Sequence, residues 1–211
     1  MRLLTVVLLA AISTLAAAQI EQRSLKVDPQ HVSSWNTFAD NLLQLHTARI
    51  AGRRLRKQEI VGGYYKLPDF YREEQFFDAD SGRLLSRVVW EREHPDRLHE
   101  IEVFIYDDQG RVVRDYLARY LPRGRNAPVQ TLINLHAYHG GLHSFRQFDA
   151  SNNRIYESCR GRIGDEEIFL DIEEDQLMGM TPESLAILES LDYNVCFESL
   201  PLSANEYLVP H

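Results

Sequence analysis

The sequence predicts an α+β protein in which a large antiparallel β-meander, a curved sheet or half-barrel, is covered by an N-terminal helix and a short C-terminal helix. Three observations lead to this fold class. Apolar residues repeat at helical spacing over about 33–52, and apolar runs of strand length follow over about 58–172. The connections between these runs are short, which favours an up-and-down meander over parallel βαβ units. One turn phrase also recurs between the runs.

The bulk properties of the chain indicate one globular domain. Its 211 residues are enough for a single domain of ordinary size. Hydrophobic residues make up 44% of the chain and charged residues 26%, as in globular proteins. The net charge of −8 argues against a molecule built to attract nucleic acid. We therefore expect one α+β domain over 31–211, with no nucleic-acid partner.

Residues 1–18 have the pattern of a secretory signal peptide. Arg2 gives a positive start, an apolar run follows, and Ala16-Ala17-Ala18 matches the small-residue cleavage pattern. The run is shorter than the roughly 20 residues of a membrane-spanning helix. We therefore expect cleavage after Ala18 rather than an uncleaved membrane anchor, and a periplasmic or extracellular protein without a transmembrane segment in its mature chain. The polar residues 19–30 should then form a flexible arm.

The first helix is predicted over about 33–52. Spacings of three and four place Trp35, Phe38 and Leu42 on one face, which should bury Trp35 and Phe38 against the sheet. The end of this segment is basic, and two interpretations stay open. The cations complement the helix dipole, or they form a contact for an anionic surface such as lipid headgroups. The basic residues are Arg49, Arg53, Arg54, Arg56 and Lys57.

Nine segments have the character of strands. In the fourth segment, Ile101, Val103 and Ile105 alternate with other residues, and such period-two alternation between turn residues is typical of half-buried antiparallel strands. The expected strands are 58–66, 70–77, 83–91, 99–106, 111–121, 129–139, 142–149, 154–159 and 167–172.

The recurring phrase is an aromatic residue and Asp, a few small polar residues, Gly or Asn, Arg, and an aliphatic residue. It occupies 77–84, 106–112 and 148–155, and the second copy has one residue fewer between Asp and the Gly or Asn. Asp can accept hydrogen bonds from turn amides, and Gly or Asn tolerates the left-handed conformation that ends such loops. Each copy therefore predicts the tip of a hairpin. The first copy resembles the start of a calcium loop, but Val89 stands where the bidentate Glu belongs.

The C-terminal part should add one helix, one edge strand and a disulfide. Thr181 is a suitable N-cap and Pro182 suits the first helical position, which predicts a helix over about 182–191. The apolar segment 193–200 is expected to form the edge strand. Cys159 and Cys196 are the only cysteines, and an oxidising compartment favours a bond between them.

Three histidines surround Gly140-Gly141, and they are the sharpest candidate for chemistry. A two-residue turn at these glycines places His136 and His143 on one face, on a diagonal, and His139 on the other face. Neutral imidazole binds zinc or copper, so His136 and His143 could supply two ligands. A third would come from elsewhere, such as His99 or an acidic side chain. Polar cross-strand pairs on a wet face explain the cluster equally well.

Enzyme signatures such as GxSxG, HExxH and a phosphate loop are absent from the sequence. We therefore assign no catalytic and no cofactor-binding residue. The leading hypothesis is an exported, non-enzymatic binding or interaction protein that holds a protein partner or an apolar or amphipathic ligand on the curved sheet. The alternative is a metal-binding protein or metalloenzyme centred on His136 and His143. Aromatic rings are concentrated in the first strands, where core packing and edge protection explain most of them and the others could line such a surface. The rings are Tyr64, Tyr65, Phe70, Tyr71, Phe76, Phe77 and Trp90.

Overall fold

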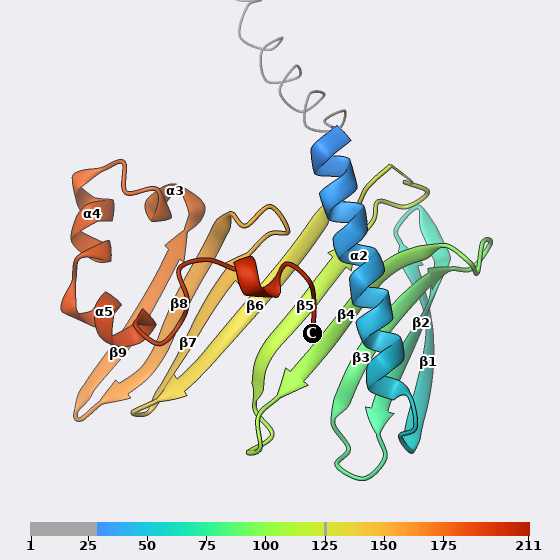
Figure 1. Cartoon of the computed structure of the whole chain (residues 1–211), viewed down its shortest axis with the longest axis horizontal. Coiled ribbons are helices and arrows are strands. Elements are labelled where there is room, and N and C mark those ends of the chain that lie inside the picture. The colour runs from blue at the N-terminus through green and yellow to red at the C-terminus, as the bar shows by residue number, and fades with distance from the viewer. Residues whose placement is uncertain (1–28, 125) are drawn as a thin grey trace, which may run out of the picture.

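The computed structural model describes residues 29–124 and 126–211. The expected signal peptide, 1–18, and most of the expected arm lie outside these ranges. Within them the chain forms one long helix, nine strands and a short helical C-terminal region (Figure 1). The elements before the C-terminal region are α2 (Pro29–Ile50), β1 (Leu55–Tyr64), β2 (Leu67–Asp78), β3 (Leu84–Glu91), β4 (Leu98–Tyr106), β5 (Val112–Arg119), β6 (Gln130–His139), β7 (Leu142–Phe148), β8 (Arg154–Ile163) and β9 (Glu166–Glu173).

The strands form one antiparallel sheet in chain order, from β1 to β9, which confirms the predicted meander. Among the described residues, β9 does not pair with β1, so the sheet is not closed. Helix α2 and the C-terminal helices lie over the same face of the sheet (Figure 1). We call this the covered face and the opposite one the open face. Fully buried side chains such as Ile101, Val103 and Ile133 fill the space between sheet and helices.

Helix α2 begins at Pro29 and ends at Ile50, a few residues earlier at each end than predicted. Proline suits the first turn of a helix because a backbone N–H at that position would have no acceptor within the helix. As predicted, Phe38 is buried. Trp35 is only half-buried, because its indole Nε1 donates to Ser151 Oγ at 2.9 Å near the edge of the core.

The three turn phrases all form hairpin tips, but their spacing differs from the prediction. The left-handed residue is Gly82 in the first copy, Gly110 in the second and Asn152 in the third. The second and third copies therefore share one spacing, and the first is the longer one. In the third copy Asn152, rather than Asn153, takes the positive φ, because the Asp149 carboxylate accepts from the Asn153 amide at 2.9 Å.

The C-terminal region contains α3 (Glu174–Leu177), α4 (Pro182–Leu188), α5 (Leu191–Phe197) and a 3-10 turn, η1 (Asn205–Tyr207). The edge strand predicted over 193–200 was wrong, because most of this segment belongs to α5. The Ser190 hydroxyl caps α5 by accepting from the Tyr193 amide. Tyr193, Cys196 and Phe197 then bury one helical face, which a strand could not do with that spacing.

Two interactions fasten α5 and the tail to the sheet. The predicted disulfide is present and joins Cys159 of β8 to Cys196 of α5. Arg146 of β7 is fully buried and pairs with Glu157, and its Nη1 donates to Leu200 O at 2.6 Å and Pro201 O at 2.9 Å. No helix in the described part of the chain has the length and hydropathy needed to cross a bilayer.

Candidate binding cleft on the open face

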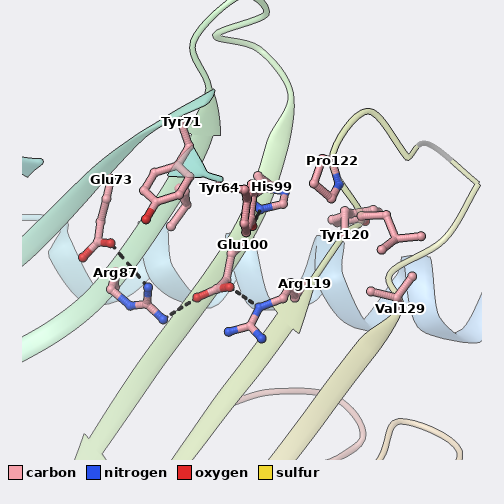
Figure 2. Close-up of a pocket in the computed structure, with 12 residues that line it drawn as sticks. Tyr64, Tyr71, Glu73, Arg87, His99, Glu100, Arg119, Tyr120, Pro122 and Val129 are labelled. Carbon is pink, nitrogen blue, oxygen red and sulfur yellow. Dashed lines mark hydrogen bonds and ion pairs between the residues drawn. The ribbon is translucent and has the colours of Figure 1, made fainter. Parts of the chain in front are cut away.

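The open face contains a cleft of about 540 Å³, which we call the open-face cleft (Figure 2). Helix α2 passes behind the strands that form its floor, so the cleft faces away from the helical layer. Side chains of β1–β5 and of the segment between β5 and β6 surround it. The lining residues are Tyr64, Tyr71, Glu73, Arg87, Val89, His99, Glu100, Arg119, Tyr120, Leu121, Pro122 and Val129.

The floor follows from strand register. Glu73, Val89, Glu100 and Arg119 lie opposite one another on the consecutive strands β2 to β5. Because side chains alternate between faces and directly opposite pairs share a face, this row must lie on one side of the sheet. The register therefore brings together charged residues that lie far apart in the sequence.

These charges form a continuous chain of ion pairs, the charge ladder, defined as Glu73, Arg87, Glu100 and Arg119 (Figure 2). Arg87 Nη1 donates to Glu73 Oε2 at 3.4 Å. The Glu100 carboxylate accepts from Arg87 at one oxygen and from Arg119 Nε at the other. Glu100 is only 5% exposed, so two guanidinium partners compensate its loss of hydration.

Glu102 supports the ladder from the next open-face position of β4. Its Oε2 accepts from Arg87 Nε at 3.1 Å. Burial raises the pKa of Glu102, although Arg87 acts in the opposite direction. Burial by itself would lower the pKa of Arg87, but Glu100, Glu102 and Glu73 together raise it. Arg87 therefore stays a cation held by three carboxylates.

One wall of the cleft is aromatic and comes from the β1–β2 hairpin. The Tyr64 hydroxyl and His99 Nε2 are 2.5 Å apart, and burial raises the pKa of Tyr64. Tyr71 stacks on His99 with ring centroids 6.2 Å apart. A Cβ at Gly62 would lie 2.6 Å from Tyr71 Oη, so a glycine at this position of β1 leaves room for the ring.

An irregularity in the pairing of β3 and β4 lets two consecutive residues line the cleft. Regular alternation would direct His99 and Glu100 to opposite faces. The register shifts between Val89 and Trp90, and such shifts re-aim side chains. Both His99 and Glu100 are buried and both border the cleft.

The facing wall is apolar and comes from the segment that joins β5 to β6. Leu121 is 48% exposed and Val129 43% exposed, and Tyr120 and Pro122 lie beside them. The described residues that line the cleft include no serine, threonine, cysteine or lysine, so they supply no common nucleophile other than carboxylate, tyrosine or histidine. The arrangement is suited to enclosing an apolar body above a polar floor.

The histidine hairpin has the predicted geometry. His139 lies opposite Leu142, and His136 and His143 share the open face. Their nearest nitrogens, His136 Nδ1 and His143 Nε2, are 3.0 Å apart. His139 lies on the covered face, where its Nε2 donates to Val195 O at 2.8 Å.

Further ligands do not gather at this pair. His136 Nε2 bonds to Asp115 Oδ2 at 2.9 Å, so both nitrogens of that ring are engaged. His99 belongs to the open-face cleft. Among the described residues, no group of three or more histidine, cysteine or acidic side chains is placed to hold a metal. Zinc or copper binding at His136 and His143 therefore stays a hypothesis.

The basic residues at the end of α2 mostly have partners within the protein. Arg53 pairs with Asp78 at 3.1 Å, and Arg54 pairs with Asp80. The other interactions are those of Lys57 with Glu59 and Glu74, and of Arg56 with the face of the Phe77 ring. Burial, with Arg53 and Arg114 nearby, lowers the pKa of Arg49. The pairing accounts for most of the cluster without an external partner, and contact with an anionic surface stays a prediction.

Sequence reasoning did not find the charge ladder. Its members are single charged residues in four separate strands, and each is an ordinary polar position within its own strand. The available signal was the concentration of aromatic residues in the first strands, which include Tyr64 and Tyr71. Comparison of the chain with protein-family models, curated proteins and solved structures gave no significant match.

Proposed function

We propose that the chain is an exported, non-enzymatic binding protein that holds an apolar or amphipathic small molecule in the open-face cleft. The observation that carries the proposal is the cleft itself, about 540 Å³ between an aromatic and an apolar wall. Small-molecule sites are typically concave, lie in the range of roughly 300–1,000 Å³, and are mostly apolar with a few placed polar groups.

The size of the cleft favours a small molecule over a protein partner. A stable protein contact buries about 800 Å² on each side, whereas the walls here enclose one hollow bounded by about a dozen residues. Exposed apolar side chains at its rim, such as Leu121 and Val129, could cover the apolar part of a ligand.

Two features support export and binding without catalysis. The Cys159–Cys196 disulfide suits an oxidising compartment, in agreement with the signal-peptide pattern of residues 1–18. The carboxylates of the floor are held by guanidiniums in the charge ladder, so their oxygens are already engaged within the protein.

The test is binding of the neutral fluorescent probe N-phenyl-naphthylamine to the purified full chain. Wild type should bind it saturably. Val129→Trp, which fills the cleft, should weaken binding by about tenfold or more, equal to about 1.4 kcal/mol. Val209→Trp is the matched control, since Val209 is also exposed but lies outside the cleft. It should bind like wild type.

Two outcomes would contradict the proposal. One is the lack of saturable binding by wild type. The other is equal binding by wild type and Val129→Trp when both are folded, as judged by circular dichroism and thermal unfolding. Either result would make the open face a candidate surface for contacts with a protein partner instead.

The second candidate is metal binding, and the observation that favours it is the 3.0 Å approach of His136 Nδ1 and His143 Nε2. Wild type should then take up zinc or copper in isothermal titration. The double variant His136→Ala/His143→Ala should lose uptake, whereas His139→Ala, on the other face, should keep it. Equal uptake by wild type and the double variant would rule this candidate out.

A further inference from the structure

Resting on the proposed function, we propose that the ligand of the open-face cleft carries an acidic group and that Arg119 binds it. The ligand class is then an amphipathic acid, with a carboxylate or similar oxyanion at one end and an apolar body between the two walls. Arg119 would be the residue that selects for the acid.

Arg119 borders the cleft, and part of its guanidinium is exposed there. Its Nε pairs with Glu100 and its Nη1 donates to Gln130 Oε1 at 3.3 Å. Within the described part of the chain, Nη2 has no hydrogen-bond partner. The side chain is 42% exposed. A guanidinium can only donate, so its ligand must supply an acceptor, and an anionic acceptor gives the stronger bond.

The other members of the charge ladder are occupied within the protein. Arg87 is bonded to three carboxylates and is 24% exposed. Each Glu100 oxygen already accepts from a guanidinium, and the Glu100 side chain is 7% exposed. Of the ladder's charges, Arg119 is therefore the one most accessible to a molecule in the cleft.

The net charge near the floor gives the opposing argument. Glu73, Glu100 and Glu102 outnumber Arg87 and Arg119, which by itself would favour a cation. However, Glu102 does not line the cleft, and its carboxylate is already paired with Arg87. Glu73 is 12% exposed against 42% for Arg119. Direct contact therefore favours an anion, because a charge-assisted bond at contact distance is stronger than the field of shielded charges.

The walls determine the rest of the ligand. Tyr64 and Tyr71 stand on one side of the cleft, and Leu121, Pro122 and Val129 stand on the other. An acid bound at Arg119 would extend its apolar part between them. A carboxylate is a strong acceptor for a guanidinium N–H, which makes a medium-chain carboxylate the simplest probe of this class.

The experiment measures displacement of bound N-phenyl-naphthylamine by three ligands with the same alkyl chain, namely dodecanoate, dodecanol and dodecylamine, at neutral pH. Wild type should prefer dodecanoate to dodecanol by about tenfold or more, as expected for a hydrogen bond between charged groups. Arg119→Gln should lose this preference. Arg160→Gln, an exposed arginine of β8, is the matched control and should behave like wild type.

The outcomes separate the inference from the proposed function. Equal displacement by all three ligands, or a preference for dodecylamine, would overturn the acidic ligand while leaving the cleft as a binding site. Retention of the dodecanoate preference by Arg119→Gln would overturn the role of Arg119. If wild type does not bind the probe, both proposals fail. The three-ligand comparison on wild type stands even if Arg119→Gln does not fold.

Discussion

At the residue scale, the histidines show how far the surroundings of a side chain determine its contacts. His139 donates to the backbone carbonyl of Val195 in α5, and the rings of His136 and His143 contact each other on the open face. The sequence predicted these three positions, because a two-glycine turn determines which face each residue occupies. His46 and His99 bond to Ser86 and Tyr64, residues 40 and 35 positions away. Only the packed structure shows those partners.

His46 gives a pH prediction. Burial against Phe76 and Ser86 lowers its pKa from the ordinary 6.5, with Glu74 in partial opposition. At higher pH the ring is neutral in both folded and unfolded chains. As pH falls below about 6.5, the unfolded chain takes up the proton first, so the free energy of unfolding should fall.

The measurement is urea unfolding of wild type and His46→Gln across this pH range. Wild type should lose more stability on acidification than the variant, because glutamine does not titrate. Parallel pH profiles for the two proteins would show that His46 does not contribute to acid sensitivity.

At the element scale, strands and helices depend on different forces. The strands stabilise one another through backbone hydrogen bonds between neighbours in the sheet. Helices α4 and α5, in contrast, have seven residues each, too few to be stable as isolated helices. Helix α5 therefore relies on its cap at Ser190, the disulfide, and the buried Arg146–Glu157 pair. The predicted strand over 193–200 failed for this reason, since a capped apolar segment follows whichever periodicity buries its side chains.

Arg146 supplies the prediction at this scale. Arg146→Met would leave Glu157 fully buried with only Arg154, at 3.4 Å, as a charged partner. We expect a loss of about 3–5 kcal/mol in the free energy of unfolding, measured by urea titration. Arg160→Met on the neighbouring strand is the control, and because Arg160 is 62% exposed it should change stability by about 1 kcal/mol or less. Similar losses of stability in both variants would contradict the stabilising role of the buried Arg146–Glu157 pair.

At the scale of the whole molecule, one sheet serves two purposes. Its covered face supports the helices and forms the core. Its open face is polar, yet Glu100 and Asp115 there are only 5% and 7% exposed, because neighbouring side chains that bond to them also cover them. A cleft can therefore form on the face opposite the described helices, with its charges already paired.

The sequence by itself determined the fold class, the nine strands, the hairpin tips, the disulfide pair and the histidine geometry. These features depend on neighbours in the chain, on alternation, or on the presence of only two cysteines. The tertiary structure decided the open-face cleft, the helical form of 193–197, and the environments of His46 and His99. Each depends on register accumulated over several strands or on packing between distant segments. A one-residue shift in the pairing of β2 with β3, β3 with β4, or β4 with β5 would move a member of the charge ladder to the other face, so local sequence could not place them together.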